Sequence, residues 1–262
     1  MTLDPRLTAG QDSPPAGRSR GLLVTVAILF VTVIVLVVAL VLALGDGGPQ
    51  DGAAPDESTS APEAESSPTS PAALSPEETV ALLMAQQRRD PDDPYALGDV
   101  DADIVIVQYA DYRCGYCALW HVEVAPALDP YIESGQVRFE YRDHPVLGDA
   151  SVYAALAARA AGQQGLFWEY GDALYRDTYD GVDPAYDRSY FLEVAERVGV
   201  ADLEAFEGAL TDSDVLGDIM ASRDEALSLN ITGTPTFIVH DTLVPGALGT
   251  DQFLELVELR LP

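Results

Sequence analysis

Lysine is absent from this 262-residue sequence, and the 14 arginines stand against 43 aspartates and glutamates. Residues 76–262 hold 11 of these arginines and 35 acids, a formal charge of −24. A surface of this sign repels phosphate backbones and anionic lipid headgroups. We therefore expect no nucleic-acid partner. The acidity either keeps the domain soluble or attracts basic polypeptides.

Cysteine is also scarce, with two residues in the chain, so a small scaffold held by several disulfides is excluded. The two are Cys114 and Cys117, separated by Gly115 and Tyr116. A structural zinc site needs four N or S ligands, and only three histidines are present to complete one. A structural disulfide closing so short a loop contributes little stability. The pattern favours a redox pair, with no metal and no cofactor.

One long apolar run is present at residues 22–44, and it carries no charge. At about 1.5 Å per residue, a helix of this length crosses a hydrocarbon core of about 30 Å. The run is longer than the apolar region of a cleaved signal peptide, so it predicts a transmembrane helix. Three arginines precede the run and the first base after it is Arg88. The positive-inside bias therefore predicts a single-pass cell-membrane protein with residues 1–21 cytoplasmic and all that follows residue 45 extracytoplasmic.

Residues 45–75 are rich in Pro, Ser, Ala, Gly and acids and contain no aromatic residue, which predicts a disordered linker. The folded domain is predicted to occupy residues 76–262. It opens on a capping-box pattern from Ser75 to Glu78 with Pro at the first helical position, which predicts a short helix to about Arg89.

Hydrophobic periodicity predicts the remaining elements of this domain. In chain order they are a strand at 103–111, a helix at 118–134 interrupted at Pro126 and Pro130, a strand at 136–144, several helices over about 149–229, strands at 234–240 and 242–247, and a helix at 250–259. This is an α/β arrangement, with a βαβ half and a ββα half separated by a helical insertion.

The Cys pair falls between a predicted buried strand and a predicted helix. If Cys114 is the N-cap residue, its sulfur faces unpaired backbone N–H groups and the positive end of the helix dipole. That environment stabilises a thiolate. Cys117, one turn further on, is placed to attack a mixed disulfide formed at Cys114.

Four segments carry a family resemblance. They are VQYADYRCGYC at 107–117, FWEYGDALY at 167–175, ITGTPTFIV at 231–239 and VPGAL at 244–248. In this order and spacing they resemble the DsbA-like thiol:disulfide oxidoreductases of the thioredoxin superfamily. The resemblance extends over about residues 76–261 and implies a thioredoxin-like fold with a helical insertion domain.

The resemblance also implies roles for individual residues and partners. Cys114 and Cys117 would be the catalytic redox pair, and the peptide bond between Thr234 and Pro235 would be cis. The backbone of Thr234 would pair with an extended client chain. The clients would be Cys-containing exported proteins, and a membrane partner linked to quinone would recharge the pair.

The sequence departs from the family at one position. Members commonly have a buried acid six residues before the first Cys, and here that residue is Gln108. Asp111 matches another common acid; it either assists proton transfer or caps a turn. Tyr116 is expected to be exposed and to tune the pair. Trp120 and His121 are interpreted as core residues.

Three functions remain open from the sequence. A dithiol oxidase is favoured, because a well-stabilised Cys114 thiolate makes the pair an electron acceptor. Gly115, Tyr116 and Thr234 also occur in disulfide isomerases of this superfamily, which leaves an isomerase or reductase as the alternative. The third is a client-binding module whose Cys pair is inactive.

Overall fold

The computed structural model describes residues 74–262. The predicted cytoplasmic tail (1–21), the predicted transmembrane helix (22–44) and all but the end of the predicted linker (45–75) lie outside these residues. Within residues 74–262, no helix combines the length and the apolar character needed to cross a membrane.

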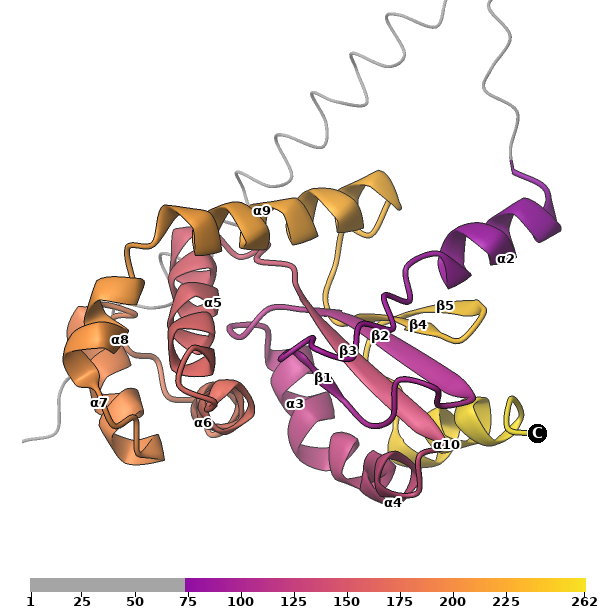
Figure 1. Cartoon of the computed structure of the whole chain (residues 1–262), viewed down its shortest axis with the longest axis horizontal. Coiled ribbons are helices and arrows are strands. Elements are labelled where there is room, and N and C mark those ends of the chain that lie inside the picture. Colours follow the sequence, from indigo (N-terminus) through magenta and orange to yellow (C-terminus); the bar gives the residue numbers. More distant parts are fainter. Residues whose placement is uncertain (1–73) are drawn as a thin grey trace, which may run out of the picture. The chain divides into compact units, whose positions relative to one another are not determined.

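A five-stranded mixed sheet forms the centre of the domain (Figure 1). In spatial order its strands are β1 (Ala96–Leu97), β3 (Val137–Asp143), β2 (Ile104–Ala110), β4 (Thr236–Val239) and β5 (Thr242–Pro245). Strands β2 and β3 are parallel, whereas β4 is antiparallel to both β2 and β5. Every residue of β2, β3 and β4 is buried, because helices cover both faces of the sheet.

The two faces of the sheet carry different helices (Figure 1). On one face, α3 (Gly115–Glu123) and α10 (Thr250–Glu258) pack through Trp120 and Phe253 against Phe237 of β4. On the other face, α2 (Pro76–Met84) and α9 (Ser213–Ser228) contribute Leu83 and Ala226 to a smaller apolar cluster with β2. The alternation of side chains along β2 therefore separates two apolar cores.

Strand β3 also contains charged residues that are fully buried, and they are paired. Glu140 is 0% exposed and accepts hydrogen bonds from Arg138 at 2.9 Å and Arg142 at 2.7 Å. Its carboxylate also accepts the backbone N–H groups of Arg88 and Arg89. The segment after α2 is thereby fastened to the sheet, and the buried charge is offset by its partners.

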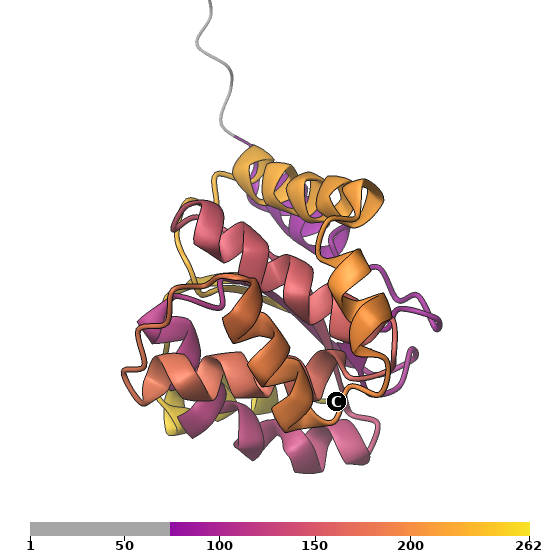
Figure 2. The ribbon, with the colours of Figure 1, turned by 90° about the vertical axis from the view of Figure 1, so that its left-hand side faces the viewer.

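The predicted helical insertion over about 149–229 is confirmed. It comprises α5 (Asp149–Gly162), α6 (Phe167–Tyr179), α7 (Arg188–Val198), α8 (Leu203–Ala209) and α9. Side-chain oxygens of Asp187, Asp202 and Asp212 cap the starts of α7, α8 and α9. Figure 2 shows these helices on the side of the domain that faces the viewer, and α5 and α6 contribute more buried residues to the third apolar core than the other helices do.

The structure differs from the sequence prediction in detail. The first helix ends at Met84 instead of about Arg89, and the chain then turns through a left-handed residue, Arg89, at φ 46°. The predicted helix at 118–134 starts earlier, at Gly115, and divides at its prolines into α3, a 3-10 turn η1 (Ala125–Leu128) and α4 (Asp129–Glu133). Strand β1 was not predicted, because its two residues leave no periodic pattern.

Candidate active site

Cys114 and Cys117 lie where the chain leaves β2 and enters the first turn of α3. Cys114 is the N-cap residue of α3, with φ −80° and ψ 116°, which is the position on which the expected stabilisation of its thiolate depends. Its backbone N–H bonds to the carbonyl oxygen of Asp111 at 3.0 Å, which fixes the turn. Both cysteines are free thiols here, and Cys114 is partly exposed whereas Cys117 is 0% exposed.

The loop before β4 meets the Cys pair. Its Thr234-Pro235 peptide bond is cis, as the family resemblance implied. The thiol of Cys114 donates a hydrogen bond to the carbonyl oxygen of Thr234 over 3.2 Å, across 120 residues of sequence. The antiparallel register of β2 and β4 places Tyr109 opposite Thr236, so the end of one strand lies beside the start of the other. The sheet therefore brings the two loops together.

Hydrogen bonds stabilise the anionic form of Cys114. They lower the pKa of its thiol from 9.0 to about 6, with the largest contribution from the side chain of Cys117. Burial of the sulfur opposes this shift, whereas the side chain of Thr234 and the backbone N–H groups of Cys117 and Tyr116 reinforce it. At neutral pH the sulfur is a thiolate, which is the form that attacks disulfides.

Cys117 has the opposite character. Burial raises the pKa of its thiol well above 9.0, and the hydrogen bond and charge of Cys114 raise it further. The pair therefore holds one proton between an exposed thiolate and a buried thiol. This asymmetry lets Cys114 react first with an incoming disulfide. Cys117 then forms the Cys114–Cys117 disulfide, a step called ring closure below.

Two polar side chains lie under the pair. Asp111 is buried, and its carboxylate accepts the backbone N–H groups of Arg113 at 2.8 Å, Val146 at 2.9 Å and Leu147 at 3.1 Å. These bonds join the turn before Cys114 to the loop after β3, as the turn interpretation predicts. Gln108, on β2, is 1% exposed, and among the described residues its amide has no hydrogen-bond partner.

The remaining side chains near the pair face solvent or the core. Tyr116 is 70% exposed, in keeping with its predicted exposure. Trp120 is fully buried against Phe139, Phe237 and Phe253, which confirms its interpretation as a core residue. Within residues 74–262, no group of three or more His, Cys, Asp or Glu side chains is placed to hold a metal ion.

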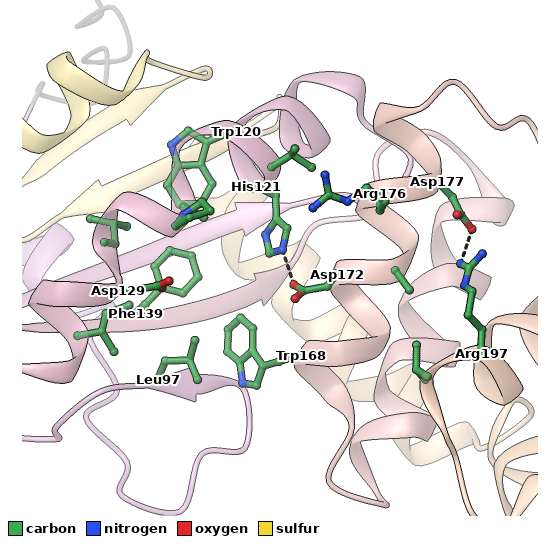
Figure 3. Close-up of a pocket in the computed structure, with 17 residues that line it drawn as sticks. Leu97, Trp120, His121, Asp129, Phe139, Trp168, Asp172, Arg176, Asp177 and Arg197 are labelled. Atoms are coloured by element: carbon green, nitrogen blue, oxygen red, sulfur yellow. Dashed lines mark hydrogen bonds and ion pairs between the residues drawn. The ribbon is translucent and has the colours of Figure 1, made fainter.

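His121 lies in a setting that its core interpretation did not predict. Its Nε2 and Oδ1 of Asp172 on α6 are 2.5 Å apart, and its ring lies 4.6 Å from that of Tyr175. The sequence did hold one signal, because His121 follows Cys117 by four residues and so shares its helix face. Figure 3 shows the His121 ring directed at Asp172 beside a cavity of about 590 Å³.

Comparison with known proteins agrees with this geometry. A family model described as Thioredoxin matches residues 90–259. A thioredoxin-like oxidoreductase from Silicibacter pomeroyi is 33% identical with a TM-score of 0.56, over 68% of this chain and 95% of that one. A probable disulfide bond formation protein D from Bacillus cereus is 28% identical over 56% of this chain and 70% of its own length. The chain belongs to the thioredoxin family, among its DsbA-like thiol:disulfide oxidoreductases.

Two further similarities concern the fold and a relative with a different activity. The structure of α-DsbA1 from Wolbachia pipientis shares the thioredoxin-like fold, with 22% identity and a TM-score of 0.57 over 65% of this chain and 91% of that one. A sodium/proton antiporter, NhaA 3 of Salinispora tropica, is 36% identical over 58% of this chain. The match spans only 22% of that antiporter, so antiport is not carried over to this chain.

Gln108 is notable because it replaces a residue type that is common in this family. In DsbA-like proteins a buried acid is common there, and an amide has no proton to exchange. The structure confirms that the position is buried beneath α3 and that Gln108 occupies it without a described partner. A thioredoxin-family member with this replacement needs another acceptor for the proton of Cys117.

Proposed function

We propose that this thioredoxin-family protein is a dithiol oxidase that transfers the Cys114–Cys117 disulfide to Cys-containing exported proteins. The observation that supports this direction is the lowered pKa of Cys114, about 6, because a stable thiolate favours the reduced form of the pair. A pair that is stable when reduced gains electrons readily and so oxidises its clients. Cys114 and Cys117 are the residues we propose to carry the reaction.

The reaction proceeds by two thiol–disulfide exchanges. A client thiolate attacks the sulfur of Cys114, the Cys114–Cys117 bond breaks, and Cys117 leaves as a thiolate that takes a proton. A second client thiolate then attacks the client sulfur of the mixed disulfide and releases Cys114 as its thiolate. The client gains a disulfide and gives up two electrons to the enzyme, which ends with both cysteines reduced.

The loop at Thr234 and Pro235 is the proposed client-binding element. A cavity of about 350 Å³ lies along residues 230–236 and the neighbouring part of β5, including Leu243. Leu243 is 40% exposed there, so the wall contributes apolar surface. An extended client segment adds a short strand to the Thr234 backbone and presents its Cys to Cys114.

The cellular setting is part of the proposal. The uncharged run at 22–44 anchors the chain in the cell membrane, with the domain from 76 onward held outside by the linker. A membrane partner linked to quinone reoxidises the pair by accepting its two electrons. The proposed anchor lies outside the residues that the structure describes, and the proposed partner would act on Cys114 and Cys117.

The reduction potential of the Cys114–Cys117 couple tests the direction of the reaction. Equilibration of the full chain with glutathione buffers, in detergent, gives the potential from the fraction oxidised. We expect a value nearer about −120 mV than about −270 mV, which mark a strong oxidant and a reductant in this superfamily. A value at the reducing end would contradict the oxidase.

Two assays separate the alternatives. An oxidase restores activity to reduced ribonuclease and fails with scrambled ribonuclease, whereas an isomerase restores activity to both. The Cys117→Ser variant is expected to accumulate mixed disulfides with exported proteins on a nonreducing gel. If that gel is blank while Cys114→Ala still binds clients, the chain is a redox-inactive binding module.

A further inference from the structure

The buried thiol of Cys117 has to exchange a proton each time the pair reacts. During reoxidation it attacks the sulfur of Cys114 as a thiolate, and during client oxidation it leaves as one and is reprotonated. Cys117 is 0% exposed, so bulk water does not reach its sulfur. Gln108, at the position of the family acid, has no proton to give or take. A different group must carry this proton.

Two buried acids lie in this part of the domain. The Asp111 carboxylate accepts three backbone N–H groups. Asp143, at the end of β3, is 1% exposed and bonds through Oδ2 to Arg159 of α5 at 2.6 Å and 2.7 Å, whereas its Oδ1 has no partner among the described residues. Neither acid reaches the surface. A proton delivered to either one would have no path to solvent.

The tyrosines around Cys117 are poor acceptors but suitable relays. Tyr112, Tyr141 and Tyr175 lie in the same apolar core as Cys117, and burial raises the pKa of each hydroxyl well above 10.0. After burial, the charge of Cys117 is the next largest cause of the raised pKa of Tyr175, so the two groups are close. The hydroxyl of Tyr175 is 3.0 Å from that of Tyr141. These hydroxyls keep their protons and can pass one along.

His121 is the titratable base on the same helix face as Cys117. Residues four apart in a helix have Cβ atoms about 5–6 Å from each other. Its ring lies 4.6 Å from the ring of Tyr175. A cavity of about 10 Å³, close to the size of one water molecule, is lined by His121, Tyr175, Tyr112 and Tyr141. This cavity therefore brings the His121 ring together with tyrosines of the apolar core that contains Cys117.

Asp172 connects His121 to solvent. The distance of 2.5 Å from its Oδ1 to Nε2 of His121 places the imidazole proton on Nε2 and leaves Nδ1 as the acceptor. The Asp172 side chain is 64% exposed, and both residues line the cavity of about 590 Å³ in Figure 3. The other charged groups around that cavity are Arg176 and Asp177 of α6, Asp129 of α4 and Arg197 of α7, of which Asp177 and Arg197 pair at 2.7 Å.

We propose that His121, held by Asp172, takes the proton from Cys117 when the pair is oxidised and returns it when a client is oxidised. This inference rests on the proposed thiol–disulfide chemistry. In the oxidation step the Cys117 S–H proton moves to Nδ1 of His121, and the Cys117 thiolate attacks the Cys114 sulfur of a mixed disulfide. The Cys114–Cys117 bond forms, the partner leaves as a thiolate, and the imidazolium loses its proton through the open cavity.

Acid-quenched mass spectrometry measures this step directly. The reduced full chain, in detergent, is mixed with excess glutathione disulfide, and the Cys114–glutathione adduct is followed over time. For His121→Gln, which keeps a side chain able to bond Asp172, we expect adduct formation at the wild-type rate and ring closure about 100-fold slower. The pH profile of ring closure should also differ between the wild type and the variant.

Two further variants and a control sharpen the test. Asp172→Asn should slow ring closure less than His121→Gln, and free imidazole should restore part of the rate to His121→Ala by entering the cavity. His240→Asn is the matched control, because His240 lies at the far end of β4 from Pro235 and asparagine tolerates its positive φ of 56°.

The results for His121→Gln either support the proton relay or overturn it. Wild-type closure and an unchanged pH profile in His121→Gln would overturn the relay, as would an equal slowing of adduct formation, which would mean a general structural effect. If the wild type closes its ring with glutathione but does not oxidise a reduced client protein, the proposed oxidase is wrong while the relay is still measured.

Discussion

At the scale of single residues, the site depends on two sulfur atoms in very different surroundings. Cys114 sits partly exposed at the start of α3, and Cys117 sits one turn deeper in an apolar core that also contains Tyr112 and Tyr175. The sequence was sufficient to predict that the pair lies between a buried strand and a helix, whereas the N-cap position of Cys114 was one possibility. It was not sufficient to rank Asp111 between two roles, because the three N–H groups on its carboxylate come partly from residues 35 and 36 positions away.

The lowered pKa of Cys114 predicts a pH dependence for the reduced protein. The thiol titrates near pH 6 when folded and near its ordinary value of 9.0 when unfolded. The unfolded chain therefore binds more protons between these values, and the stability of the folded form rises with pH across that window. The contribution is complete above about pH 9 and is lost as the pH falls through 6.

Urea unfolding of reduced wild type and Cys114→Ser checks this expectation. The wild type should gain stability relative to the variant between pH 6 and pH 9, and thiolate absorbance should show a midpoint near pH 6. Parallel stability curves for the two proteins, or a midpoint above pH 8, would contradict it.

At the scale of elements, α10 packs against both the sheet and α3, the helix that carries Cys117. Phe253 of α10 is 0% exposed, with its ring 5.1 Å from Trp120 of α3 and 5.0 Å from Phe237 of β4. One side chain thus connects the helix that carries the cysteines with the strand that follows Pro235. The sequence placed α10 within one residue of its observed end, but it did not predict the contacts of Phe253, because the two partner rings come from distant segments.

Phe253→Ala should therefore destabilise the domain by about 3–5 kcal/mol, the cost of emptying a fully buried aromatic site. Leu259→Ala, just beyond the same helix at 73% exposure, is the control and should change stability by less than about 0.5 kcal/mol. Urea unfolding followed by tryptophan fluorescence gives both values. A loss below about 1 kcal/mol for Phe253→Ala would mean that the helix does not stabilise the sheet.

At the scale of the whole molecule, the amino-acid composition fixes the net charge directly. The predicted extracytoplasmic domain carries −24 over residues 76–262, so long-range fields act on any client before contact. Almost all of these acids keep contact with solvent, since only Asp111, Glu140 and Asp143 are buried. The charge should influence how fast clients arrive more than how tightly they are held.

Paired Cys peptides of opposite charge test this effect. At low ionic strength, kcat/KM should be higher for the basic peptide than for an acidic peptide matched in length and Cys position. Added salt should reduce the difference, because the Debye length falls to about 3 Å at 1 M. Equal rates for the two peptides at low salt would assign the acidity to solubility alone.

The sequence by itself determined the order of the elements other than β1, the helical insertion at 149–229 and the place of the Cys pair between a strand and a helix, because each depends on neighbours in the chain. The tertiary structure alone decided which groups surround the sulfur atoms. Thr234 reaches Cys114 from 120 residues away, and Asp172 reaches His121 from 51 residues away. Such pairs are set by sheet register and helix packing, and no local pattern of residues encodes them.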